Sequence, residues 1–205
     1  MQHALVIPTG TGVPGEHDYA VTGIDSRKLG MWAFLASECL FFGALISSYL
    51  LYRTRGAAGT RPSDVYDIPY TSVSSFVLLM SSLTMVLALA AIQRGDHSRL
   101  RVWLVTTALL GSVFVGGQVY EFTIFVHDGL NLSSSVAASS FFVLTRFHGV
   151  HVTVGILWLL TLVGMSWRGQ IPVERALDIE IAGLYWHFVD VVWIVIFTIV
   201  YLVPN

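Results

Sequence analysis

Eight ionisable side chains lie inside long apolar stretches of the sequence, where a charge is costly. A charged side chain at the centre of a lipid bilayer costs at least about 2.5–3.5 kcal/mol on insertion scales. We therefore expect these residues to be buried and to face one another, another subunit or water. The eight candidate functional residues are Glu38, Glu121, Arg146, His148, His151, Glu180, His187 and Asp190.

Glu38 and two histidines are expected to meet. His148 and His151 share one helical face, because residues three apart are neighbours on a helix. At about 1.5 Å of rise per residue, Glu38 lies roughly 15 Å from the start of its apolar stretch, at mid-depth. A neutral carboxylic acid hydrogen-bonded to an imidazole is the least costly state for such groups. The spacing predicts that Glu38 contacts His148 or His151.

The remaining polar groups have default partners as well. Glu180, His187 and Asp190 follow one stripe of a later helix, and His187 with Asp190 is interpreted as a contact that locks helices together. Arg146 is expected to pair with a buried acid, for which Glu121 and Asp190 are both available. Glu121 is expected closer to the membrane surface than the others.

Each polar residue also has a structural interpretation. Histidines in membrane helices commonly bind neighbouring helices, and the sequence has no second HxxH and no ExxH pair that would complete a metal shell around His148, His151 and His187. We therefore expect no catalytic, metal-binding or cofactor-binding residue in this chain. Glu38 is either a proton-uptake or lipid-binding acid or a structural hydrogen-bond partner, and the sequence leaves both open.

The composition identifies the elements that hold these residues. Of 205 residues, 55% are apolar and 12% are charged, whereas soluble domains carry about 25% charged residues. These values exclude an ordinary soluble fold and a nucleic-acid-binding module, and the net charge of −2 argues against a polyanionic partner. The single cysteine, Cys39, excludes an intrachain disulfide and a CxxCH haem attachment.

Five stretches are long and apolar enough to be transmembrane helices, which need about 20 residues. Their uniform apolarity does not suit β-barrel strands, and short connections require antiparallel neighbours. We therefore predict an all-α polytopic membrane protein, with a tail at 1–28 and one bundle domain at 29–205. The predicted spans are 29–52, 71–92, 101–126, 137–165 and 180–203.

Lysine and arginine positions predict the orientation of these helices. Basic residues concentrate in the cytoplasmic connections of membrane proteins. Of the eleven lysines and arginines, seven lie on the N-terminal side of the spans, three on the opposite side and Arg146 inside a span. This distribution predicts a cytoplasmic N-terminal tail and an outer C-terminus in a bacterial plasma membrane. The seven are Arg27, Lys28, Arg94, Arg99, Arg101, Arg168 and Arg175.

Four blocks of the sequence carry a family resemblance. The blocks are MWAFLASECLFF at 31–42, GQVYEF at 117–122, SSFFVLTRFHGVHVTVG at 139–155 and EIAGLYWHFVDVVWIVIFTIVYL at 180–202. In this order they resemble subunit III of the haem–copper respiratory oxidases, which comprise cytochrome c oxidase and its quinol-oxidase relatives. The YWHFVDVVW block is the most specific of the four.

The resemblance implies a subunit without haem or copper of its own, these being held by partner subunits. It implies packing against catalytic subunit I in a complex that includes subunit II, support of proton uptake and sustained turnover, and phospholipid binding in a cleft. Glu38 matches the family's carbodiimide-reactive acid. His148 and His151 match its HGxHV motif, and Glu180 with His187 matches its E-x6-H motif.

Two features depart from the family pattern. Many members have seven helices with a lipid cleft between the first two and the other five, whereas this chain has five predicted spans, so its groove is either open or walled by another subunit. Arg146 stands where the family usually has Gly, so no family role transfers to it.

We therefore expect a non-catalytic subunit of a proton-pumping terminal oxidase that accepts electrons from cytochrome c. The alternative within the family is a quinol oxidase. One alternative of another class is a proton-coupled transporter that uses Glu38, Glu121 and Asp190. Such a transporter would have discontinuous helices, and the position of all six prolines outside the spans argues against it. A second is a haem protein with His148 and His187 as ligands.

Overall fold

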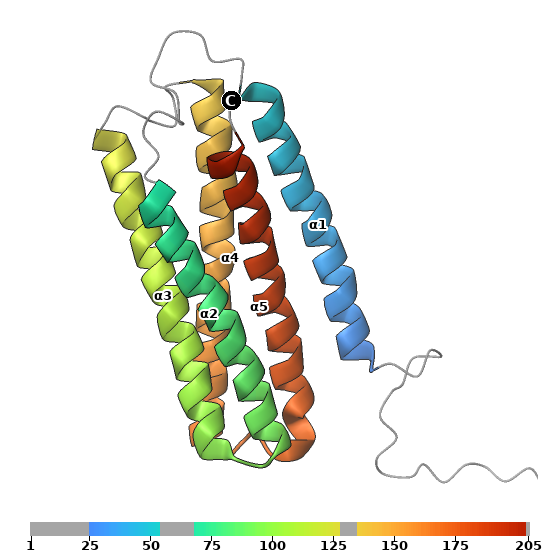
Figure 1. Ribbon diagram of the computed structural model, residues 1–205. Coiled ribbons are helices and arrows are strands. Elements are labelled where there is room, and N and C mark those ends of the chain that lie inside the picture. Colours follow the sequence, from blue (N-terminus) through green and yellow to red (C-terminus); the bar gives the residue numbers. More distant parts are fainter. Residues whose placement is uncertain (1–24, 54–67, 128–134, 204–205) are drawn as a thin grey trace, which may run out of the picture.

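The computed structural model describes residues 25–53, 68–127 and 135–203, and these form a bundle of five long helices (Figure 1). A short 3-10 helix, η2, precedes the last of them, and a π-helical segment, η3, continues it. All five are long and apolar enough to cross a membrane. The predicted all-α, five-span fold is confirmed. The elements are α1 Ser26–Tyr52, α2 Ile68–Gln93, α3 His97–His127, α4 Val136–Trp167, η2 Val173–Arg175, α5 Ala176–Phe197 and η3 Thr198–Leu202.

Helices α1 and α4 begin before the apolar stretches from which they were predicted, because a polar side chain caps each of them. Asp25 caps α1 by accepting a 2.8 Å hydrogen bond from the backbone N–H of Arg27. Ser135 caps α4 in the same way, through the backbone N–H of Ala138 at 3.0 Å. Such side chains satisfy N–H groups that have no partner within the helix. The hydrophobic span is therefore shorter than the helix that contains it.

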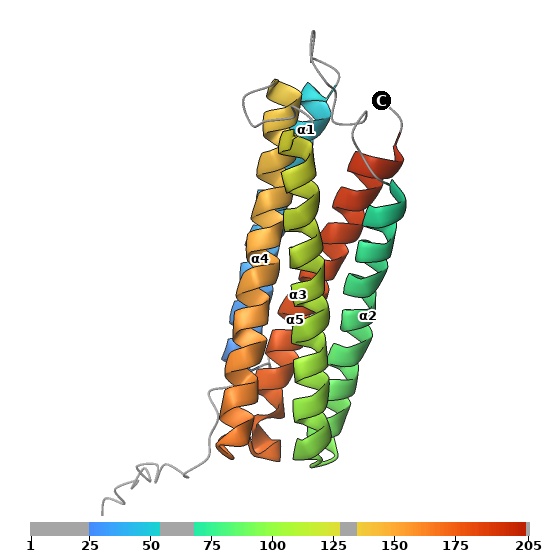
Figure 2. The same cartoon turned by 90° about the vertical axis from the view of Figure 1, so that its left-hand side faces the viewer.

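Helices α2 to α5 form the body of the bundle, and α1 lies outside it. Helix α2 packs against α3 and α5, and α3 packs against α4. The main interfaces of α1 among the described helices are with α4 and α5. Figure 2 shows α1 behind α4, on the far side from α2. The described part of the N-terminal tail is Asp25–Lys28, whose last three residues belong to α1, and residues 1–24 lie outside the described residues.

Two tryptophans of α5 fill the centre of the bundle. The side chains of Trp186 and Trp193 are almost fully buried and donate hydrogen bonds to serine hydroxyls of α2, Ser81 at 2.9 Å and Ser75 at 2.8 Å. A buried indole N–H needs a partner in a membrane, and the serines supply it. The two bonds fix the rotation of α5, which determines where its polar residues point.

Candidate functional site

One narrow stripe of α1 contacts the bundle. Its buried residues are Leu35, Phe42 and Tyr49, seven residues apart, and only 11% of its most apolar stretch is buried. Glu38 lies three residues after Leu35 and four before Phe42, so it belongs to the same stripe. The spacing of these apolar residues in the sequence could have identified the inner face of α1.

The Glu38 carboxyl contacts a histidine of α4. Its Oε2 atom lies 3.2 Å from Nε2 of His151, and the two side chains are 16% and 18% exposed, respectively. The predicted contact with a histidine of span four is therefore present, and the histidine is His151. The pair joins α1 to α4 within the membrane span.

Hydrogen bonding at the other ring nitrogen sets the chemistry of this pair. Nδ1 of His151 lies 2.7 Å from the backbone oxygen of Phe147, a contact in which only the ring can donate. With Nδ1–H committed there, a neutral imidazole can only accept at Nε2. Nε2 and Oε2 lie 3.2 Å apart but form no hydrogen bond of normal geometry, and a hydrogen bond between these two atoms would require one proton on the pair.

Aromatic side chains surround the pair. The ring of Phe42 lies edge-on to His151 with 5.0 Å between centroids. The hydroxyl of Tyr185 on α5 donates a 2.9 Å hydrogen bond to the backbone oxygen of His151, and Phe34 of α1 stacks on Tyr185 at 6.4 Å. Three helices therefore meet at this carboxyl–imidazole pair, which is largely shielded from the surroundings.

His148 points to a different place, although it shares a helical face with His151 in the sequence. Its ring is fully buried, stacks on Trp193 with 4.9 Å between centroids, and meets the ring of Phe114 edge-on at 6.0 Å. Neither ring nitrogen forms a hydrogen bond within the described residues. Its contacts are those of a packing residue of the α3–α4–α5 core.

His187 bonds to α2 rather than to Asp190. Its Nδ1 atom lies 2.6 Å from the hydroxyl of Ser82. Asp190 is 3% exposed; Ser82 is the polar side chain beside its carboxyl, whose oxygens form no hydrogen bond of normal geometry within the described residues. The predicted His187–Asp190 contact is therefore wrong, because the rotation of α5 directs His187 toward a serine of the neighbouring helix.

Glu121 ties three helices together near one end of the bundle. It is 5% exposed, accepts a 2.7 Å hydrogen bond from the hydroxyl of Thr71, and lies 3.5 Å from the hydroxyl of Tyr201. Thr71 is in the first turn of α2, and Tyr201 is in η3. Glu121 therefore lies where the start of α2 meets η3, and its depth in the membrane stays a prediction.

Two of the predicted residues are not buried within this chain. Arg146 is exposed and forms no ion pair with a described carboxylate; its guanidinium lies over the rings of Phe142 and Phe122, 5.3 Å and 5.9 Å from their centroids. Helical side chains lean toward the N-terminus, so the guanidinium extends toward the start of α4. Glu180 is partly exposed and pairs with Lys28 of α1.

The Lys28–Glu180 ion pair belongs to a polar cluster at the start of α5. Beside it, Arg27 Nη1 lies 2.9 Å from Oδ1 of Asp178. Counting along the sequence placed Glu180 inside the membrane because the apolar stretch begins there, but α5 itself begins at Ala176. The partners on α1 show that Glu180 lies at a helix end. The Arg27–Asp178 pair was missed because both residues lie outside the predicted spans.

The described residues contain no group of three His, Cys, Asp or Glu side chains placed to hold a metal ion. The polar residues instead form separate contacts, each between two or three helices. One such contact joins α1, α4 and α5 around Glu38 and His151.

Comparison with known proteins identifies the family. The family model described as "Cytochrome c oxidase subunit III" matches residues 6–204. The chain belongs to the cytochrome c oxidase subunit III family. It is 41% identical over 85% of both chains to the quinol oxidase subunit 3 of Bacillus spizizenii, and 38% identical over 86% of both chains to the cytochrome c oxidase subunit 3 of Bacillus sp. strain PS3.

A third relative comes from a different group of bacteria. The cytochrome bo(3) ubiquinol oxidase subunit 3 of Pseudomonas aeruginosa is 34% identical over 91% of this chain and 90% of its own length. This chain is therefore a subunit III of a haem–copper terminal oxidase and a multi-pass bacterial membrane protein. Membership of a multisubunit oxidase also removes the support for the transporter alternative.

Proposed function

We propose that this chain is a non-catalytic subunit that stabilises the catalytic subunit of a proton-pumping terminal oxidase and supports its proton uptake during sustained turnover. The observation that carries the proposal is the Glu38–His151 pair, in which Oε2 of the carboxyl lies 3.2 Å from Nε2 of the imidazole between two transmembrane helices. Within such a pair a proton can pass between the carboxyl and the imidazole without leaving an unpaired charge in the membrane, because one state is a neutral pair and the other an ion pair.

The other polar contacts support a structural role for the rest of the chain. His187 is bound to Ser82, and Glu121 accepts a hydrogen bond from Thr71, so both residues hold α2 to a neighbouring helix. Haem and copper would reside in partner subunits, of which subunits I and II are the expected neighbours. In this proposal His148 is a packing residue and not a haem ligand.

Phospholipid binding is a further part of the proposal. A groove of about 460 Å³ lies between α1 and α5, and its lining includes Trp32, Leu35, Cys39, Leu184 and Phe188. An acyl chain suits such a surface, because the groove is almost entirely apolar and lies within two transmembrane helices. We propose this surface as the lipid groove of the chain, in place of the cleft that the seven-helix members have.

The N-terminal end of α1 is proposed to face the cytoplasm. Arg27 and Lys28 lie at this end with the α2–α3 and α4–α5 connections, where Arg94, Arg99 and Arg168 are also found. The excess of basic residues at one end follows the rule for cytoplasmic connections.

We propose cytochrome c as the electron donor of the complex, with quinol as the second candidate. The second candidate is favoured by the 41% identity to a quinol oxidase subunit 3 of Bacillus spizizenii. Oxygen consumption by the purified complex, measured separately with reduced cytochrome c and with a quinol, distinguishes the two. Activity with the quinol alone would reject cytochrome c.

The role of the pair is tested by Glu38→Ala in the assembled oxidase, with Glu174→Ala as the matched control because Glu174 is an exposed acid in η2. We expect unchanged haem spectra in both complexes. Only the Glu38 variant should lose activity faster during turnover, retain less lipid or assemble less well. A fully assembled Glu38 variant without haem signal would contradict the non-catalytic assignment.

A further inference from the structure

A second cavity lies at the turn between α2 and α3, away from α1. Its volume is about 410 Å³, and both helices contribute to its walls. Gly95 makes the turn with a φ of +73°, a conformation that suits glycine. Asp96 comes next and directly precedes α3, which begins at His97. The cavity therefore lies at the end of two transmembrane helices, at the level where a bilayer changes from hydrocarbon to headgroups.

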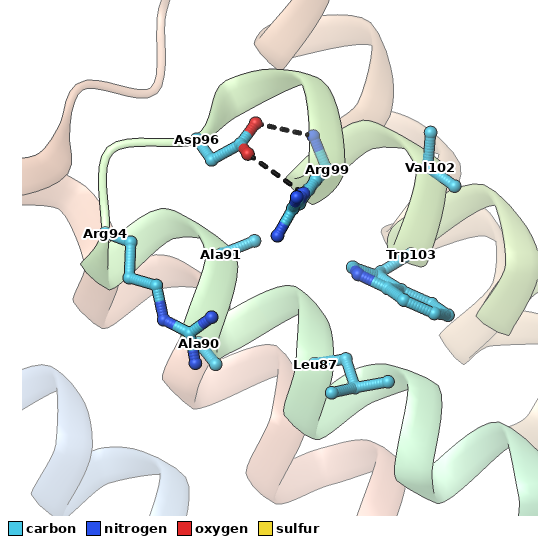
Figure 3. Close-up of a pocket in the computed structure, with 8 residues that line it drawn as sticks. All are labelled: Leu87, Ala90, Ala91, Arg94, Asp96, Arg99, Val102 and Trp103. Atoms are coloured by element: carbon cyan, nitrogen blue, oxygen red, sulfur yellow. Dashed lines mark hydrogen bonds and ion pairs between the residues drawn. The ribbon is translucent and has the colours of Figure 1, made fainter.

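Two arginines reach over this cavity from opposite sides. Arg94 follows the last residue of α2 and Arg99 lies in the first turn of α3, and Figure 3 shows both side chains extending toward the space between the helices. Arg99 pairs with Asp96 at 3.2 Å, whereas Arg94 has no carboxylate partner among the described residues. Asp96 is also engaged as the cap of α3, since it accepts a 2.9 Å hydrogen bond from the backbone N–H of Arg99. The rim therefore carries an excess of one positive charge.

The wall of the cavity below the arginines is apolar. It consists of Leu87, Ala90 and Ala91 from α2 and of Val102 and Trp103 from α3. The two alanines leave the space open because they have no side chain beyond Cβ. Tryptophan is typical of the interface between hydrocarbon and headgroups, and Trp103 lies one turn below Arg99. The cavity thus combines a cationic rim with an apolar wall.

We propose that this cavity binds an anionic phospholipid, with the phosphodiester at Arg94 and Arg99 and one acyl chain along Leu87, Ala90 and Trp103. Guanidinium groups bind phosphate oxygens through charge-assisted hydrogen bonds, and basic pockets between transmembrane helices bind anionic headgroups. The combination of charge and apolar surface favours an amphiphile over a helix of a partner subunit, which would leave Arg94 without an anion. This site is separate from the groove between α1 and α5 and does not depend on the electron donor.

The test uses the intact oxidase complex purified in mild detergent, with phosphatidylglycerol as the probe. The double variant Arg94→Gln, Arg99→Gln removes both cations. Arg168→Gln is the matched control, because Arg168 lies at the same end of the bundle, at the C-cap of α4, and does not line this cavity. Bound lipid is counted by mass spectrometry after extraction, on complexes whose haem spectrum and subunit composition match the wild type. This requirement separates failure of the lipid site from failure of the proposed oxidase function.

We expect the double variant to retain one fewer phosphatidylglycerol per complex and to rebind it from doped micelles with an affinity lower by roughly fivefold per arginine. The control should retain the lipid, and phosphatidylcholine retention should be unchanged. A second variant, Ala90→Trp, fills the apolar part of the cavity without changing charge and should also lose the lipid. Equal retention in wild type and double variant, or equal loss in the Arg168 control, would overturn the proposal.

Discussion

Replacing the two members of the Glu38–His151 pair, singly and together, tests whether they form one unit. Glu38→Met keeps a side chain of similar length without the carboxyl. His151→Phe keeps a ring for the edge-on contact with Phe42 and leaves the bond from Tyr185 intact, because that bond goes to the backbone oxygen of residue 151. Each single variant therefore leaves one polar group in the membrane without its partner, and the double variant removes both.

The geometry sets the expected magnitude. Polar contacts between membrane helices contribute about 0.6 kcal/mol on average and up to about 1.7 kcal/mol. The two side chains are only 16% and 18% exposed, so the coupling energy between Glu38 and His151 should lie near the upper value. The Lys28–Glu180 ion pair serves as the comparison, because its side chains are 31% and 37% exposed and exposed pairs contribute about 0.2–1 kcal/mol.

The free energies are measured by pulse proteolysis of this chain in the purified complex across an SDS titration. We expect each single variant to lower the unfolding free energy by about 1–3 kcal/mol, the cost of an unsatisfied buried polar group. The double variant should lose less than the sum of the two. Strict additivity of the two single effects would refute the claim that the carboxyl and the imidazole interact.

Two further substitutions test the packing and the polar contacts of the bundle. Gly111→Ala should destabilise the chain by about 1–3 kcal/mol, because an added Cβ lies 2.6 Å from a ring carbon of Trp186, whereas Gly116→Ala on the same helix meets nothing within 4 Å and should be neutral in the same proteolysis assay. Equal effects of the two would argue against the tight packing. Thr71→Val should lower stability by about 1–3 kcal/mol because it leaves the Glu121 carboxyl without its 2.7 Å donor; an unchanged SDS midpoint would show that this hydrogen bond contributes nothing.

Length and apolarity were sufficient to predict the five helices, because a polypeptide in lipid must satisfy its backbone hydrogen bonds internally. The spacing of the polar residues also predicted that Glu38 meets a histidine of span four. The choice of His151 over His148 depends on the rotation of α4, which is set by the stacking of His148 on Trp193. Such rotation is weakly encoded in a sequence that is apolar on every side of the helix.

The same ambiguity explains the errors. Arg146 was expected to pair with Glu121 or Asp190 as the available buried acids, but the side chain lies on the outside of α4 over two aromatic rings. Asp190 was expected to pair with His187 from their spacing alone, and the tryptophan–serine bonds of α5 turn His187 toward α2 instead. Spacing identifies residues that share a face, whereas tertiary packing decides what that face meets.

The central claim is that this chain supports a catalytic partner and carries out no redox chemistry itself. It is tested most directly by comparing the purified oxidase with and without this chain, recording the haem spectrum, the initial rate of oxygen consumption and the decay of that rate during turnover. We predict identical spectra and similar initial rates, with faster decay in the complex that lacks the chain. Loss of a haem signal from the otherwise complete complex, recovered with the isolated chain, would contradict the claim.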